Sequence, residues 1–237
     1  MAPRSIHNTL LSALPIELRN KLEPDLERVS LHLGRVLYEP GEILRYVYFP
    51  VDCIVSSVYV MESGASSGTL VIGNEGMVGI AVFLGGASTP GRAIVQTSGY
   101  AYRLPARAFK EEFISHPQLL LLLLRYTQSL LTQVAQTAAC NRHHAIDQQL
   151  CRWLLLSLDR SPDNHLTMTQ ELISNVLGVR REGITQAAGK LQRLGVIEYS
   201  RGHITVVSRA KLEALSCECY AVVKKEISRL MPAECIT

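Results

Sequence analysis

Short apolar segments alternate with turn-forming residues along the first 110 positions of the chain. Val, Ile and Tyr are frequent at 45–60, 69–72, 91–96 and 101–104, and runs rich in glycine and serine lie between these segments. A succession of short strands with a turn signal about every 8–12 residues is typical of a β-roll or barrel. A leucine pattern over residues 10–22 predicts a short helix before the first strand.

The period of the apolar positions changes after residue 108. From Phe109 to about Ala139 there is no glycine, and apolar side chains recur at spacings close to those of a coiled-coil seam. We expect one long helix that pairs in parallel with the same helix of a second copy, because its apolar stripe is too wide for one small β-domain to cover. The alternative is a helix that packs only on its own β-domain. The expected seam positions are Leu120, Leu123, Thr127, Leu130, Leu131 and Val134.

The last hundred residues predict a winged helix-turn-helix. We expect helices at 145–158, 170–177 and 181–194, a hairpin formed by 196–199 and 203–207, and a helical tail over 209–231. Two helices separated by three residues and followed by a basic hairpin form this motif. Gly178 is expected in the left-handed conformation that ends the first helix, and Thr169 is expected to cap its start. Leu194 is expected on the inner face of the second helix.

The outward face of the second helix carries side chains that can read bases. Arg can bond guanine bidentately, Glu accepts from cytosine, and Gln can pair with adenine, so Arg181, Glu182 and Gln186 are candidate base readers. Lys190 and Arg193 are candidate phosphate contacts. The alternative is a purely structural three-helix packing motif with a charged exterior. The full candidate DNA-binding set is Thr169, Arg180, Arg181, Glu182, Thr185, Gln186, Lys190, Arg193 and Arg201.

The distribution of charge supports the DNA-binding interpretation. The 237 residues carry a net charge of +3. Up to residue 140 there are 11 basic and 11 acidic side chains, against 13 and 10 beyond it. Between residues 178 and 211 there are seven basic side chains and two acidic ones, as expected of a surface that faces phosphates.

Composition excludes two classes of protein. Hydrophobic residues make up 47% of the chain, which is ample for a core and argues against intrinsic disorder. The leucine run at 119–124 is far shorter than the roughly 20 residues of a membrane span. The first seven residues show no apolar signal-peptide region. We therefore expect a cytoplasmic protein that does not contact a membrane.

The run Leu177-Gly178-Val179-Arg180-Arg181-Glu182, together with the residues around it from Met168 to Ile197, resembles the helix-turn-helix of the Crp/Fnr family of bacterial transcription regulators. The order of the remaining elements is similar to that family as well. The resemblance implies an α+β fold in three parts. These are a cyclic-nucleotide-binding-like β-roll sensor at 1–108, a dimerisation helix and hinge at 109–143, and a winged helix-turn-helix with a C-terminal helix at 144–237.

The same resemblance implies partners and an effector site. It implies a homodimer on palindromic double-stranded DNA, with Arg181 and Glu182 reading the half-site and RNA polymerase as a further partner. Gln186 stands where the family usually has a second arginine. In the β-roll, Gly79 and Arg92 are the implied effector-binding residues. Because a buried phosphate needs several donors, and because Ile80 and Ala93 replace the glutamate and hydroxyl of the cyclic AMP binders, we expect another small effector, or none.

The cysteines predict neither a disulfide framework nor a metal or other cofactor. None of the six forms a CxxC pair, and the first is Cys53, whereas the family's iron–sulfur sensors need a cluster of cysteines near the N-terminus. We interpret the residues around the inferred hinge near Asn141 as ordinary packing rather than as a metal or haem site. Redox sensing by an exposed thiol is an alternative. The hinge set is Cys140, His143, His144 and Cys151, and Cys217 and Cys219 are expected on opposite sides of a helix.

An enzyme is the second class of function that we consider, because β-rolls also host metal-dependent oxygenases and isomerases. Such sites need a close His-x-His pair and a carboxylate. Before His116 the chain offers only His7 and His32. P-loop, nucleophile-elbow and zinc-protease motifs are absent from the sequence. We therefore expect no catalytic activity.

Overall fold

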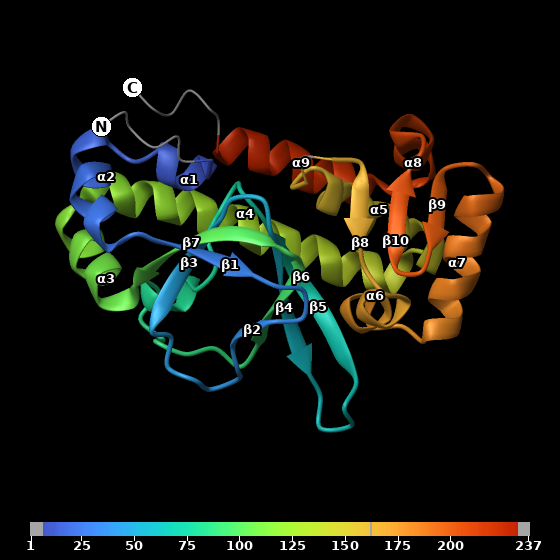
Figure 1. The fold of residues 1–237 in the computed structure, drawn as a ribbon, viewed down its shortest axis with the longest axis horizontal. Helices are drawn as coiled ribbons and strands as arrows, with labels where there is room; N and C mark the ends of the chain where they lie inside the picture. The colour runs from blue at the N-terminus through green and yellow to red at the C-terminus, as the bar shows by residue number, and fades with distance from the viewer. Residues whose placement is uncertain (1–6, 162, 232–237) are drawn as a thin grey trace.

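The computed structural model describes residues 7–161 and 163–231. A β-roll and a winged helical domain lie side by side, and one long helix runs along both of them (Figure 1). The elements before the roll are α1 (Thr9–Ser12), α2 (Ile16–Leu22) and the 3-10 turn η1 (Glu23–Asp25). Within the described residues, none of the helices has the length and apolar character needed to cross a bilayer.

The roll consists of two antiparallel sheets. The first has the order β1 (Glu27–Leu31), β7 (Gly99–Pro105), β3 (Tyr46–Pro50). The second has the order β2 (Val36–Tyr38), β6 (Arg92–Thr97), β4 (Ile54–Val60), β5 (Ser66–Ile72). Val47 lies opposite Leu104 in the β3–β7 register, and both side chains are fully buried, so these two strands contribute to the core of the roll.

The β-roll prediction is confirmed, with corrections to its strands. The single segment expected at 45–60 is two strands, β3 and β4, which lie in different sheets. The strands β1 and β2 were not predicted, because their residues are largely exposed or half-buried and lack a strong apolar alternation. A 3-10 turn, η2 (Ile80–Val82), follows Gly79, whose φ of +105° places it in the left-handed region.

The helix expected as one piece from Phe109 to about Ala139 is two helices, α3 (Ala106–Ser115) and α4 (Pro117–His143). The chain breaks at His116, which is extended at φ −126° and ψ 100°. The cause is Pro117, because a proline ring disfavours the helical conformation in the residue before it and is itself suited to the first helical position. The helix α4 then runs to His143, so the break expected near Asn141 comes at His144.

The inner face of α4 packs against the roll of the same chain. Tyr126 is buried and bonds the backbone of Met77 twice, accepting from its nitrogen at 3.0 Å and donating to its oxygen at 2.8 Å. Leu123 and Leu130 are buried in the same core, which corrects their expected place on the dimer seam. The exposed apolar residues of α4 lie beside this inner face: Leu120, Leu121, Leu124, Leu131 and Val134, the last two at the edge of a cavity next to the roll. Thr127 is half-buried and bonds within the helix.

The winged domain contains α5 (Ile146–Leu158), β8 (His165–Thr167), α6 (Gln170–Leu177), α7 (Arg181–Arg193), β9 (Ile197–Ser200), β10 (His203–Val206), α8 (Arg209–Leu215) and α9 (Glu218–Leu230). Three differences from the sequence predictions stand out. β8 joins the hairpin as a third strand, in the order β8-β10-β9. The helical tail breaks at Ser216 into α8 and α9, and α9 returns along α4 (Figure 1). Leu194 lies beyond the end of α7 and is half exposed.

Candidate DNA-binding site

The helix-turn-helix is set by two local signals that the sequence predicts correctly. Thr169 caps α6, and its hydroxyl accepts a hydrogen bond from the Leu172 nitrogen at 3.2 Å. Gly178 ends α6 with φ +68° and ψ +31°, a left-handed conformation that glycine adopts without steric cost. The chain then turns through Val179 and Arg180 into α7.

The second helix, α7, has one buried apolar face and one exposed polar face. Ile184 and Leu191 are buried in the domain core, as predicted, whereas Arg181, Glu182 and Gln186 are exposed. The Thr185 hydroxyl donates to the Gln170 side-chain oxygen at 3.0 Å and so ties α7 to α6. The exposed N-terminal half of α7 has the properties of a recognition helix.

The basic residues at the end of α7 differ in their surroundings. Lys190 forms an ion pair with Asp147 at the start of α5, and this hydrogen-bonded ammonium lowers the pKa of the Asp147 carboxyl. Arg193 is exposed, and together with Lys190 and Gln186 it lines a shallow hollow that reaches Asp147. Lys190 is therefore oriented by the protein, and its charge is partly offset.

The wing ends in a tight two-residue turn. Arg201 and Gly202 have φ values of +48° and +84°, the positive pair that a hairpin of this length favours. Arg201 is exposed at the tip. The Met168 nitrogen donates to the Gly202 carbonyl oxygen at 2.7 Å, which brings the wing tip beside Thr169. The wing and the start of α6 thus form one continuous surface with exposed polar side chains.

Comparisons with known proteins agree with this geometry. Residues 148–215 match the family model of the Crp-like helix-turn-helix domain. The chain has the fold of the Crp/Fnr regulators. One similar structure is FixK2 from Bradyrhizobium japonicum, with 16% identity over 81% of this chain and 98% of that one and a TM-score of 0.65. A second is TTHB099, a CRP-family transcriptional regulator from Thermus thermophilus, with 19% identity over 80% and 96% and a TM-score of 0.65.

A third similar structure is TTHA1359, a CRP/FNR-family transcriptional regulator from the same organism. It is 23% identical over 80% of this chain and 98% of that one, with a TM-score of 0.59. A search of curated protein sequences finds no match. The shared fold therefore rests on structures of low sequence identity, and the helix-turn-helix rests on a direct sequence match.

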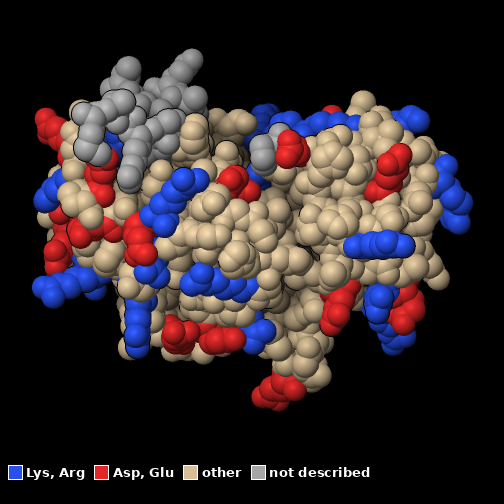
Figure 2. Space-filling view, viewed as in Figure 1, with Lys and Arg blue, Asp and Glu red and all other residues tan. Residues whose placement is uncertain are grey.

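The charged side chains of the protein do not form one large surface patch of a single sign. In the view of Figure 2, acidic and basic side chains are mixed over both domains. On the described surface of α7 and the wing, Glu182 and Glu198 accompany the basic residues. Arginine and lysine side chains would therefore meet phosphates individually rather than through one continuous basic surface.

The large cavity of this Crp/Fnr fold lies between the roll and α4 and has a volume of about 760 Å³. Gly79, which was predicted at an effector site, lines it together with Tyr38, Tyr59 and Thr127. Its lining contains no charged side chain among the described residues. Arg92 is not part of the lining. It lies at the surface, where its Nε is 2.8 Å from the Glu39 carboxylate, which corrects its expected position.

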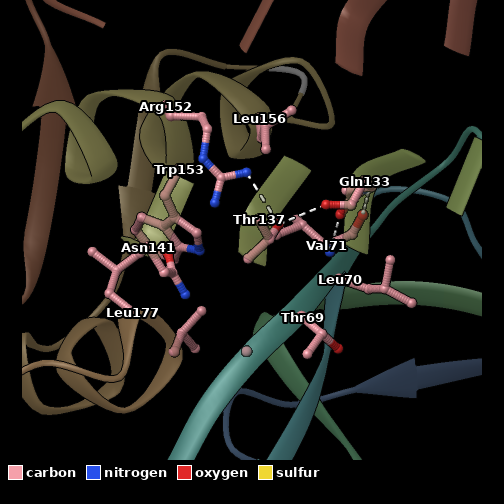
Figure 3. A pocket seen from close by; sticks show the side chains of 12 residues that line it. Thr69, Leu70, Val71, Gln133, Thr137, Asn141, Arg152, Trp153, Leu156 and Leu177 are labelled. Atoms are coloured by element: carbon pink, nitrogen blue, oxygen red, sulfur yellow. Dashed lines mark hydrogen bonds between the residues drawn. The ribbon is translucent and has the colours of Figure 1, made fainter. Parts of the chain in front are cut away.

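The junction where the roll, α4 and the winged domain meet is tightly packed. Gln133 of α4 bonds the backbone of Val71, accepting from its nitrogen at 2.6 Å and donating to its oxygen at 3.3 Å (Figure 3). Arg152 of α5 is buried and donates to the Thr137 hydroxyl at 3.2 Å (Figure 3). The space between these residues is about 10 Å³, roughly enough for one water molecule and too small for an effector.

Further polar contacts hold the winged domain on the roll. Arg160, after α5, forms an ion pair with Glu75, with 2.7 Å between Nε and Oε1. The Ser66 hydroxyl of β5 donates to the Asn175 carbonyl oxygen of α6 at 3.1 Å. None of these contacts was predicted from the sequence, because each joins residues far apart along the chain.

The cysteines of the described residues are all buried, which does not favour the exposed thiol considered for redox sensing. Burial raises the pKa of Cys53, Cys140 and Cys151 to about 12, and it raises the pKa of Cys217 as well. Cys235 lies outside the described residues.

The cysteines also group differently from the sequence interpretation. Cys140 lies beside Cys217, with 3.6 Å between the sulfur atoms, and Cys219 lies beside His144. Cys217 and Cys219 were expected on opposite sides of one helix, but Cys217 precedes α9 as its N-cap and both thiols are buried. Cys151 packs in the core of the winged domain instead, and His143 is exposed.

Proposed function

We propose that this protein is a sequence-specific transcription regulator that binds palindromic double-stranded DNA as a homodimer. The observation that carries the proposal is the exposed N-terminal half of α7, where Arg181, Glu182 and Gln186 face outward from a helix buried on its opposite side. Recognition helices present these positions to base edges in the major groove. The three side chains suit guanine, cytosine and adenine respectively.

The other residues of the proposed interface position the protein on the duplex. Lys190, Arg193 and Arg201 are proposed to contact phosphates, and such contacts fix register without reading sequence. The interface is completed by Thr169, Arg180 and Thr185, all exposed. The similarity to transcription regulators of the Crp/Fnr fold supports this assignment and gives no support to an enzyme.

The test begins by selecting bound sequences from a random duplex pool and measuring affinity by anisotropy at one fixed salt concentration. Arg181→Ala and Glu182→Ala should each weaken the selected site by about 1–3 kcal/mol, or about 5- to 150-fold, and relax preference at one base pair. Arg229→Ala is the matched control, because Arg229 is a half-exposed arginine at the far end of α9. Equal losses on selected and scrambled duplexes would show that these residues do not read bases, and no binding to any duplex would refute the proposal.

We assign dimerisation to the outer face of α4. Leu124 and Leu131 are 51% and 64% exposed, and the apolar residues around them form a stripe that water would otherwise cover. Leu131→Glu should shift the protein from dimer to monomer in light scattering after size exclusion. Ile114→Glu is the control, since Ile114 is 73% exposed on α3, outside the stripe. A Leu131→Glu protein that stays dimeric would refute this seam.

The proposed sensor is the β-roll at 1–108, and its effector, where there is one, is an uncharged and largely apolar molecule in the 760 Å³ cavity. A buried cyclic phosphate would find no cation in the described lining. Saturating cyclic AMP should therefore leave the melting temperature unchanged, because only a ligand that binds the folded state raises it. A clear rise would overturn this assignment.

The proposed mechanism links these parts. The segment 109–143 joins the two copies. The orientation of the winged domain, at 144–237, depends on its contacts with the roll. A signal that shifts those contacts would change whether the two recognition helices fit successive major grooves, about 34–36 Å apart. RNA polymerase is the proposed partner of the DNA-bound dimer.

A further inference from the structure

Four side chains of metal-binding type meet where the long helix ends. Cys140 lies in the last turn of α4, and His144 is its C-cap. Cys217 and Cys219 flank Glu218 at the start of α9. Their ligand atoms, three sulfurs and one imidazole nitrogen, all lie within 4.8 Å of one another. The three thiols are buried, and the His144 ring is mostly buried.

The separations match a tetrahedral zinc site. With Zn–S bonds of about 2.3 Å and Zn–N bonds of about 2.0–2.1 Å, the four ligand atoms of a tetrahedron lie about 3.6–3.8 Å apart. The Cys140 and Cys217 sulfurs are 3.6 Å apart, and the Cys219 sulfur is 3.5 Å from the His144 Nδ1. The widest separation needs to close by only about 1 Å to complete the tetrahedron.

Polar contacts with neighbouring groups hold the His144 ring and the Cys219 thiol in the way that is usual for zinc ligands. The Nδ1 of His144 faces the sulfurs, while its Nε2 is 3.4 Å from the Glu218 carboxylate. A carboxylate on the second ring nitrogen fixes the tautomer in which the first nitrogen is free to bind a metal. The Gln136 amide donates to the Cys219 sulfur at 3.1 Å, a bond that favours a thiolate.

A buried arginine near the cluster lacks a countercharge that an anionic zinc–thiolate site would provide. Arg152 is only 3% exposed and donates to the neutral Thr137 hydroxyl, and its Nε has no partner among the described groups. The described residues pair no carboxylate with it. An uncompensated buried cation is costly. Burial raises the pKa of the Cys140 thiol, and the nearby charge of Arg152 partly opposes that rise. Zinc with three thiolates and one neutral imidazole has a net charge of −1, which would balance this guanidinium.

We propose that Cys140, His144, Cys217 and Cys219 together bind one zinc ion. Binding releases the three thiol protons to solvent, and the neutral His144 ring coordinates through Nδ1 while Nε2 keeps its proton for Glu218. Four protein ligands leave no open position, so the site is structural. It fastens the end of α4 to the start of α9, and so fixes the junction between the roll and the winged domain.

The experiment uses the full chain, purified under reducing conditions from cells supplied with zinc. Elemental analysis should find about one zinc ion per protomer. Cobalt(II) added to the reduced, zinc-free protein should give the intense visible absorption of tetrahedral cobalt–thiolate coordination. Cys219→Ala and His144→Ala should each lower zinc affinity at least tenfold. Cys151→Ala is the matched control, because Cys151 is equally buried on α5 but outside the cluster, and it should keep its zinc.

The cobalt spectrum needs no variant, so the test remains decisive if a substitution prevents folding. Zinc well below one ion per protomer together with no cobalt–thiolate absorption in the parent protein would overturn the proposal. A Cys140–Cys217 disulfide recovered in place of bound metal would also overturn it. The measurement involves no DNA, so its outcome is independent of the proposed DNA binding.

Discussion

The ion pair between Glu75 and Arg160 is the buried charge that most directly holds the two domains together. Arg160 is 4% exposed, its Nε lies 2.7 Å from the Glu75 carboxylate, and a second nitrogen donates to the Leu156 carbonyl oxygen at 2.7 Å. The third guanidinium nitrogen has no partner among the described groups. Glu75→Gln therefore removes the countercharge and leaves a buried cation with only neutral acceptors.

The expected cost follows from burial. Removing one partner of a buried pair destabilises by about 3–5 kcal/mol. The Glu75 side chain keeps 19% exposure, and the glutamine oxygen can still accept one hydrogen bond. We therefore expect a loss of stability somewhat below that range, about 2–3 kcal/mol. This is about a 30- to 150-fold change in the unfolding equilibrium.

Urea unfolding followed by tryptophan fluorescence measures this cost. Trp153 is the sole tryptophan of the chain, is 2% exposed and lies on α5 beside the domain contact, so its emission reports on that region. The matched control is Glu39→Gln, whose partner Arg92 is 37% exposed, and an exposed pair contributes below about 1 kcal/mol. If Glu75→Gln lost no more stability than Glu39→Gln, the reasoning about the buried pair would be refuted.

Three further predictions concern the helix-turn-helix and the ion pair that joins α7 to α5. Gly178→Ala should lower the free energy of unfolding by about 1–2 kcal/mol in the same urea assay, because the residue has φ +68° and an added Cβ would come within 3.1 Å of the Ser67 hydroxyl. Gly189→Ala is the control, since Gly189 lies in open space within α7, and it should leave the free energy of unfolding unchanged or raise it. Asp147→Asn should raise affinity about two- to fivefold for selected and scrambled duplexes alike by freeing Lys190, and unchanged binding would mean that Lys190 does not contact phosphate. Because Lys190 lowers the pKa of Asp147, the carboxylate stabilises the fold above its ordinary pKa of 3.8 and loses that contribution as the pH falls below it, so the parent and Asp147→Asn should converge in stability in acid.

The elements that the sequence predicted correctly are those with a local signature. Gly178 and the cap Thr169 mark both ends of α6 through backbone geometry that only neighbouring residues decide. The hairpin of β9 and β10 is marked by the turn at Arg201 and Gly202 in the same way. The break at Pro117 also had a local signature, but the helical periodicity on both sides of it outweighed the proline in our prediction.

The faces of α4 could not be assigned from periodicity. Leucines surround much of this helix, so the pattern indicates two apolar faces without showing which one meets the roll. Only the position of the sheets decides that Leu123 faces inward and Leu131 outward. Arg92 was placed at the effector site by the family resemblance alone, and its ion pair with Glu39 joins residues 53 positions apart, which no local pattern predicts.

The cysteine cluster was missed because its two halves lie more than 70 residues apart in the sequence. Cys140 and His144 are four residues apart, the spacing of neighbours on one helix face, which was a usable signal. The pair Cys217 and Cys219 gave none, because the break between α8 and α9 that turns both thiols inward had not been predicted. Long-range packing, rather than spacing, creates this candidate zinc site.

These contacts constrain how the winged domain can move. The segment between α4 and α5, His144 and Ala145, is short, and α9, which follows the wing, returns along α4, so the domain is tied to the long helix at both its start and its end. A rotation about the hinge that left the roll in place would have to separate Glu75 from Arg160 and displace α9 from α4 together. Zinc at the end of α4 would oppose the second of these changes. The proposed switch is therefore expected to pivot near the cluster and to break contacts at the roll, among them the hydrogen bonds that join Ser66 and Glu75 to the winged domain.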